Sequence, residues 1–129
     1  MPSYNFLEFQ ADCADSSKIH VWPSASEDAD KYFGLGTKEE ICDFIIDNDE
    51  TDFFQFINSA LLDKKPKGQI NDAMVDAYSF EHGTKSGYLA FYRGQTGKWI
   101  IKSFHLHSSS PLTYNPLAIE LMRRLSHGS

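Results

Sequence analysis

Cysteine is scarce in this sequence, and its two thiols form no recognisable motif. Cys13 and Cys42 are the only cysteines among 129 residues, and neither belongs to a Cys-x-x-Cys pair. Two thiols do not make the disulfide framework of a small secreted domain. The first residues also lack the basic segment followed by an apolar segment that marks a secretion signal. We therefore expect a reduced, cytoplasmic protein.

Long hydrophobic runs and several common functional motifs are also absent. No apolar run approaches the ~20 residues that a helix needs to span a bilayer, so we expect no membrane partner. The sequence contains no phosphate loop, nucleophile elbow, dinucleotide fingerprint or internal repeat. What it does contain is 41% hydrophobic, 14% aromatic and 23% charged residues. This composition is typical of one folded domain, which we place over residues 1–129.

Charge is distributed unevenly along the chain. Residues 1–63 carry three Lys and Arg against fourteen Asp and Glu, a net charge of −11. Residues 64–129 carry nine against four, a net charge of +5, so the two parts sum to the overall −6. A local basic face leaves nucleic acid open as a partner, because cations meet phosphates. The alternative interpretation, in which acidic and basic residues simply balance across a folded surface and have no functional role, stays open as well.

The first part of the chain predicts one short strand and three helices. Residues 18–22 favour a strand that Pro23 ends, and residues 24–33 favour a helix capped by Ser24 or Ser26 and ended by Gly34. A helix is predicted over 37–47, because Thr37 and Glu40 have the spacing of a capping box. Another is predicted over 50–62 with Asp49 as its cap, because the apolar residues fall on one helical face: Phe53, Ile57, Ala60 and Leu61.

The second part changes to a period of two, which is typical of strands. Residues 63–72 are polar and predict an exposed loop. Strands are then predicted over 73–81, 87–93 and 98–106, with a turn at 82–87, and a helix over 114–125 with Asn115 as its cap and Pro116 at its first position. The fold class is therefore α+β, with two to three helices packed on a three- to four-stranded antiparallel sheet. We expect residues 108–129 to form a C-terminal helical extension of the domain.

The last two strands place aromatic and imidazole side chains together. A four-residue loop at 94–97 would pair Arg93 with Lys98, and opposed residues of an antiparallel pair share a face. One face would then be a core face, with Leu89, Phe91, Ile100 and Phe104. The other would collect Tyr88, Tyr92, Trp99, Ser103, His105 and His107, with Tyr88 and His105 as diagonal neighbours.

Such a face suits RNA cleavage by acid–base chemistry. An imidazole takes the proton of a ribose 2′-hydroxyl, a second group protonates the leaving 5′-oxygen, and aromatic rings stack on unpaired bases. Two other interpretations stay open. The histidines are solvated surface residues, or His105 and His107 bind zinc with His82, although no carboxylate or cysteine joins them at a recognisable spacing.

The stretch 34–57, "GLGTKEEICDFIIDNDETDFFQFI", resembles the MqsR family of bacterial toxins, which are mRNA interferases. The segments "DAYSF" (76–80), "GYLAF" (87–91) and "IIKSFHLH" (100–107) follow in the order that the family shows. The resemblance implies a RelE-like ribonuclease fold, cleavage of single-stranded mRNA and neutralisation by an antitoxin protein. The family tyrosine falls at Tyr88, and a family lysine falls at His105. Another lysine and a glutamine of the family fall at Gln55 and near Val75, and are missing here.

Our first hypothesis is a ribonuclease toxin that needs no cofactor and no metal. Tyr88 and His105 would be catalytic, with His107 or His82 assisting. Lys85, Arg93 and Lys102 would contact phosphates, and Tyr92 and Trp99 would stack on bases. The alternative is a non-catalytic protein-binding module, such as an inhibitor or immunity-type protein, whose acidic half meets a basic partner.

Overall fold

The protein is built on one five-stranded sheet, described here from a computed structural model over residues 1–107. The strand order is β1-β5-β4-β3-β2. Neighbouring strands pair antiparallel, except β1, which runs parallel to β5. The predicted helix over 114–125 and the predicted extension over 108–129 lie outside the described residues. The strands are β1 (Ile19–Val21), β2 (Gln55–Leu61), β3 (Met74–His82), β4 (Lys85–Arg93) and β5 (Trp99–Leu106).

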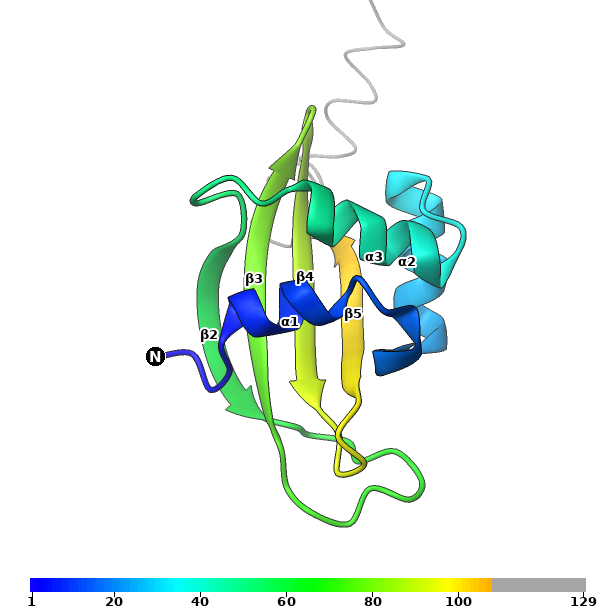
Figure 1. The fold of residues 1–129 in the computed structure, drawn as a ribbon, viewed down its shortest axis with the longest axis vertical. Coiled ribbons are helices and arrows are strands. Elements are labelled where there is room, and N and C mark those ends of the chain that lie inside the picture. Colours follow the sequence, from blue (N-terminus) through cyan, green and yellow to red (C-terminus); the bar gives the residue numbers. More distant parts are fainter. Residues whose placement is uncertain (108–129) are drawn as a thin grey trace, which may run out of the picture.

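Three α-helices lie over one face of this sheet (Figure 1). They are α1 (Phe6–Asp12), α2 (Pro23–Phe33) and α3 (Lys38–Asp47), and a short 3₁₀ turn, η1 (Ser16–Lys18), connects α1 to β1. We call the covered face the helix side and the opposite face the far face. The α+β class is therefore shown, but the sheet has five strands rather than three or four, because β1 and β2 join the predicted meander at its two edges.

The core lies between the helices and the sheet and is unusually aromatic. Phe9 of α1 is fully buried and stacks on Phe91 of β4, with ring centroids 3.9 Å apart and an interplanar angle of 5°. Side chains alternate between the two faces along a strand, so the core positions of β4 are Leu89 and Phe91. Tyr88, Ala90 and Tyr92 consequently belong to the far face.

Helix α1 was not predicted, and it forms through a local cap together with packing on the sheet. The side chain of Asn5 caps it by accepting hydrogen bonds from the backbone N–H groups of Leu7 and Glu8 at 2.9 and 3.3 Å. Seven residues are too few to be stable alone, so packing of the buried Phe9 ring on the sheet must hold the helix in place.

The predictions for α2 and α3 are confirmed, with one correction at a cap. Thr37 accepts a hydrogen bond from the backbone N–H of Glu40 at 3.1 Å, as the capping box requires. Gly34 ends α2 in the left-handed region, at φ 71°, which glycine adopts at little cost. The predicted caps Ser24 and Ser26 are wrong, because the helix begins at Pro23 and Trp22 is its N-cap residue, without a side-chain hydrogen bond.

The helix predicted over 50–62 is wrong. Residues 55–61 form the edge strand β2, which pairs antiparallel with β3, and Asp49 caps no helix there. The apolar spacing suited both structures, but tertiary packing favours the strand. Phe54 and Phe56 both turn toward the helix side, where Phe54 meets Phe6 at 5.1 Å and Phe56 meets Tyr78 at 5.5 Å between ring centroids. The polar stretch 63–72 is a loop, as predicted.

The β4–β5 hairpin forms as predicted, but its register differs. Arg93 pairs with Trp99 rather than with Lys98, and the register shifts once more between Ala90 and Phe91. Lys102 is the extra residue of this β-bulge and has no partner in β4. A shift of one residue exchanges the two faces of a strand. Trp99 therefore lies on the helix side, and Ile100 lies on the far face.

Candidate functional site

A row of polar side chains crosses four strands on the far face. The registers place Gln55 opposite Ser79, Ser79 opposite Tyr88, and Tyr88 opposite His105. The expected register makes Tyr88 a diagonal neighbour of His105. Two one-residue shifts, one at the loop that pairs Arg93 with Trp99 and one at the Lys102 bulge, make the two residues direct partners. Directly opposed residues on one face have the closest side chains in an antiparallel sheet.

Tyr88 and His105 form a parallel ring pair at the end of this row. Their ring centroids are 4.8 Å apart and the rings are inclined by only 7°. His107 meets the edge of Tyr88 at 5.8 Å and 67°, and its backbone N–H donates to the carbonyl of Ser86 at 2.8 Å. All three side chains are half-buried, so each keeps a surface toward solvent. The structure thus brings together three of the predicted catalytic residues.

The hydrogen bonding of His105 determines which ring nitrogen can act as a base. Its Nδ1 lies 2.6 Å from the carbonyl oxygen of Leu106. A carbonyl oxygen accepts hydrogen bonds and cannot donate, so Nδ1 must carry the hydrogen. In the neutral ring, Nε2 is then the nitrogen with a free lone pair, which is the form needed for accepting a proton.

Tyr88, in contrast to His105, keeps its proton and can donate it. Burial raises the pKa of Tyr88 above its usual value, because the phenolate would lose hydration. The hydroxyl is therefore a proton or hydrogen-bond donor throughout the neutral range. One neighbour able to accept a proton and one able to donate a proton is the minimum set for general acid–base catalysis.

A second polar row, next to the first, was missed by the sequence analysis. Glu81 pairs with Ser86, and the hydroxyl of Ser86 donates to both carboxylate oxygens of Glu81 at 2.9 Å. A small cavity of about 140 Å³ nearby is lined by Asp52, Gln55, Ser79 and Glu81 among others. The sequence does carry a signal for this row: a two-residue turn at Gly83 and Thr84 pairs residue 81 with 86 and residue 79 with 88, whereas the longer turn predicted over 82–87 leaves them unpaired.

His82 and Lys85 lie on the helix side, away from Tyr88 and His105. They pair with each other at the tip of the β3–β4 hairpin. The ring of His82 meets Phe44 edge-on at 5.2 Å. The ammonium of Lys85 donates to the carbonyl of Tyr32 at 2.5 Å, where it caps the last turn of α2. The structure therefore does not bring either residue to the site, because odd and even positions of a strand face opposite ways.

Arg93 and Trp99 also lie on the helix side. Arg93 forms an ion pair with Glu8 at 2.9 Å and stacks over Trp99, with 4.6 Å from guanidinium carbon to ring centroid. Trp99 is 1% exposed, and its indole N–H donates to the carboxylate of Asp12 at 2.9 Å. The expected stacking role of Trp99 is therefore corrected, since a buried indole offers no face to a base.

Tyr92 and Lys102 lie on the far face, with different accessibility. Tyr92 is fully buried and meets Trp22 edge-on at 6.3 Å, so it is not a stacking surface either. Lys102 is half-buried and points its ammonium over Trp22, 5.5 Å from the ring centroid. Its ion pair with Asp63 is long, at 4.0 Å, and Asp63 is mostly exposed, so the pair is weak.

The two cysteines belong to the core and not to the site. Cys13 and Cys42 are each 2% exposed and are not joined in a disulfide. A hydrogen bond between the thiols and burial raise the pKa of Cys13, while the same hydrogen bond lowers the pKa of Cys42. Inaccessible thiols with this pairing act as core packing residues.

Within residues 1–107, no three His, Cys, Asp or Glu side chains come together in a group suited to a metal ion. No helix in this range has the length and apolar character needed to cross a bilayer.

Comparison with known proteins adds no relative: the chain matches no protein-family model, no curated protein and no solved structure. The function of the site therefore has to be argued from its own geometry.

Proposed function

We propose that this protein is an endoribonuclease toxin that cleaves single-stranded mRNA by acid–base chemistry, with an antitoxin protein as its cognate partner. The observation that carries the proposal is the Tyr88–His105 pair, with its rings parallel at 4.8 Å on the far face. The resemblance to the MqsR toxins supports the same reading, since both residues fall at positions of the family motif.

The geometry supports a specific division of roles. Nε2 of His105 accepts the proton of a ribose 2′-hydroxyl, because Nδ1 is engaged with the Leu106 carbonyl. The 2′-oxygen attacks phosphorus, the bond from phosphorus to the 5′-oxygen breaks, and the Tyr88 hydroxyl protonates the leaving oxygen. The products are a 2′,3′-cyclic phosphate and a free 5′-hydroxyl. The imidazolium then returns its proton to the phenolate through solvent, which restores both residues.

Charge on the transferring phosphate needs a cation nearby. Lys102 is the candidate on this face, because Lys85 and Arg93 are engaged on the helix side. Gln55 stands in the same row as Tyr88, where the family has a lysine, so this row supplies an amide instead of a charge. Val75 lies on β3 four positions before Ser79, so it is outside the row of Tyr88, and its side chain is not polar. The phosphate contacts of this protein therefore differ from those the family implies.

The test is purified protein with a long unstructured RNA in the presence of EDTA. The wild type should cut the RNA and leave 2′,3′-cyclic phosphate ends. His105→Ala should lose about 10²–10⁴ in rate, which is the contribution of one general acid or base. His82→Ala is the matched control. The imidazole of His82 is exposed on the helix side, so this variant should cut RNA at the wild-type rate. Equal cleavage by wild type and His105→Ala, or no cleavage with or without ribosomes, would refute the proposal.

A second candidate function is a protein-binding module, and the acidic helix side favours it. Glu27, Asp30, Glu39 and Asp43 are exposed on α2 and α3, and none of them forms an ion pair with another described residue. A basic partner bound there should dissociate as salt rises, because screening weakens contacts between exposed charges. A pull-down that retains the same partners at low and high salt would contradict this candidate.

A further inference from the structure

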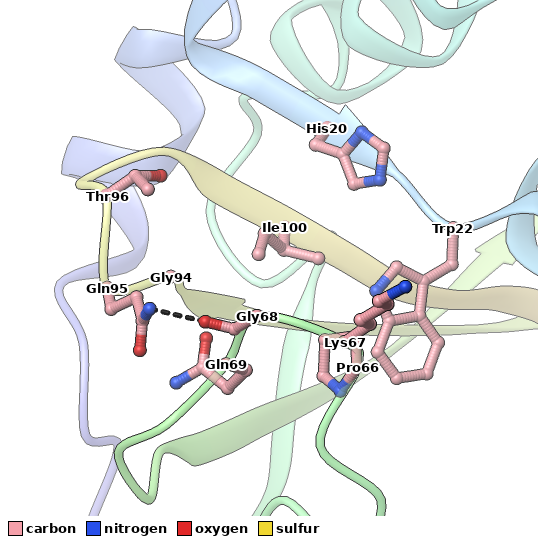
Figure 2. Close-up of a pocket in the computed structure, with 10 residues that line it drawn as sticks. All are labelled: His20, Trp22, Pro66, Lys67, Gly68, Gln69, Gly94, Gln95, Thr96 and Ile100. Carbon is pink, nitrogen blue, oxygen red and sulfur yellow. Dashed lines mark hydrogen bonds between the residues drawn. The ribbon is translucent and has the colours of Figure 1, made fainter.

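A second hollow of the far face lies beside the bulge and has its own chemistry. It encloses about 310 Å³, at the lower end of the roughly 300–1,000 Å³ typical of small-molecule sites. Figure 2 shows Trp22 and Lys67 at one end, Gln95 and Thr96 at the other, and Ile100 between them. His20 of β1 closes the remaining side.

The pocket is lined by basic side chains, although the protein as a whole is acidic. The chain has 18 Asp and Glu and a net charge of −6. Among residues 1–107, Lys67 and His20 line the pocket and no carboxylate does. Two other cavities are lined by carboxylates instead, one by Asp49, Glu50 and Asp52 and the other by Asp52 and Glu81. Lys67 is exposed and forms no ion pair among residues 1–107, so its charge is available to an anion.

The pocket also offers an aromatic surface. Trp22 is half-buried, unlike Trp99, and its ring lines the pocket. The ammonium of Lys102 lies 5.5 Å from the centroid of this ring. An indole face next to cations is the arrangement with which proteins hold an unpaired base and its phosphate. The long ion pair of Lys102 with Asp63, at 4.0 Å, is readily replaced by a phosphate.

The walls of the pocket are tied together by one side chain. The carbonyl oxygen of the Gln95 amide accepts from the backbone N–H of Ile70 at 2.8 Å and of Asn71 at 3.5 Å. Its NH₂ group donates to the carbonyl of Gly68 at 2.5 Å, as Figure 2 shows. The loop after β2 is thereby fixed to the β4–β5 hairpin. The pocket is therefore built by specific contacts between two loops.

The pocket and the Tyr88–His105 pair lie on one continuous track. Ile100 at the pocket floor and His105 are both on the far-face side of β5, about 15 Å apart at the usual rise of a strand. Lys102 lies between them because the bulge turns it to this face. A single strand of RNA lying along β5 would pass from the ring pair, over Lys102, to the pocket.

We infer that this pocket, lined by Trp22, His20 and Lys67, binds one nucleotide of a single-stranded RNA away from the cleaved bond. The base stacks on Trp22 and Lys67 contacts an adjoining phosphate, while Lys102 lies between this nucleotide and the cleaved bond. This inference rests on the proposed ribonuclease function and adds a substrate-binding position to it.

The experiment separates binding from cleavage. In the His105→Ala background, where RNA stays intact, binding of a labelled unstructured oligoribonucleotide is measured by fluorescence anisotropy over a range of salt. Trp22→Leu should weaken binding about 5-fold or more, as expected for the loss of one stacked base. Lys67→Ala should weaken binding and reduce the salt dependence by about one phosphate contact.

Lys98→Ala is the matched control, because Lys98 is in the same hairpin but lines a cavity on the helix side with Asp12 and Trp99. It removes the same charge and should change binding little. Lys67 is exposed, so its replacement leaves the fold intact and keeps the test valid even if Trp22→Leu unfolds.

The outcomes distinguish the two proposals. If the wild type cleaves RNA but Lys67→Ala and Trp22→Leu bind like Lys98→Ala, the nucleotide site is wrong and the ribonuclease stands. If RNA binding depends on Trp22 and Lys67 but the wild type does not cleave, the site stands and the ribonuclease is wrong. Absence of RNA binding by every variant refutes both.

Discussion

The imidazole of His105 lies parallel to the phenol ring of Tyr88, with 4.8 Å between centroids and 7° between planes. The two residues are direct partners across β4 and β5, because the bulge at Lys102 adds one residue to β5. Without that residue, Tyr88 would face a different position of the strand. The contact between the proposed acid and the proposed base is thus a product of strand register.

Tyr88→Phe removes one hydroxyl and keeps the stacked ring. If this hydroxyl protonates the leaving 5′-oxygen, RNA cleavage should fall by about 10² or more, while the thermal unfolding midpoint changes little. Single-turnover cleavage and a melting curve measured on the same preparation check this. A variant that cuts at the wild-type rate would remove Tyr88 from the mechanism.

The pH dependence of cleavage should have an acid limb and no alkaline limb in the accessible range. A base has to be unprotonated to accept a proton, so the rate should fall toward acid pH. Burial holds the pKa of Tyr88 above its usual value near 10, so its hydroxyl stays protonated at pH 9. Rates from pH 5 to pH 9 measure this. An activity that declines between pH 7 and pH 9 would argue against Tyr88 as the donor.

Asp76 anchors the start of the chain to β3 and should be important for stability. It is fully buried, and its carboxylate accepts from the backbone N–H groups of Ser3 at 3.0 Å and Tyr4 at 2.9 Å. Asp76→Ala leaves both donors without this acceptor, so we expect the free energy of unfolding to fall by about 2–4 kcal/mol. Urea denaturation measures it. Asp72→Ala, at an exposed ion pair, is the control and should cost under about 1 kcal/mol.

Gly87 makes room for the ring of Phe80 across the β3–β4 pair. A Cβ atom at Gly87 would lie 2.1 Å from Cζ of Phe80, which is far inside contact distance. Gly87→Ala should therefore lower the free energy of unfolding by about 1–3 kcal/mol, the usual cost of overpacking. At Gly36 the nearest atom to an added Cβ is 3.4 Å away, so Gly36→Ala is the control. Equal stability of the two variants would contradict the close packing of Phe80.

Tyr78 should make the fold sensitive to high pH. Burial and the neighbouring carboxylate of Asp76 raise the pKa of Tyr78 to about 12. The unfolded chain, with a pKa near 10, then releases this proton first, so stability is intact below about pH 10 and falls as the pH rises toward 12. Denaturant melts at pH 8 to 11 test the slope. Tyr78→Phe should reduce it, and an unchanged slope in this variant would assign the effect to other groups.

Local signals determined the parts of the fold that were predicted correctly. The capping box at Thr37 and Glu40 and the glycine after α2 are interactions within a few residues, so the sequence alone specifies α2 and α3. The period of two over 73–106 likewise specifies β3, β4 and β5. Both kinds of signal depend only on residues close together in the chain, so they can be recognised without the tertiary structure.

Non-local contacts decided what the sequence left open. Residues 55–61 suit a helix by spacing, and they form a strand because β3 offers hydrogen bonds and Phe6, Phe44 and Tyr78 offer places for Phe54 and Phe56. β1 joins β5 in parallel, which requires two segments far apart in the chain to meet. Such contacts have no local signature, because each residue is compatible with either structure until its partner is in place.

The candidate site shows the same division. Tyr88, His105 and His107 were recognised from residue type and alternation, since these are properties of single strands. The direct contact of Tyr88 with His105 depends on the bulge residue Lys102. Trp99 lies on the helix side because it pairs with Arg93. The pocket at Trp22 and Lys67 depends on the loop that follows β2. A register change of one residue alters no composition and no period. Its effect on which side chains meet is therefore a property of the tertiary structure alone.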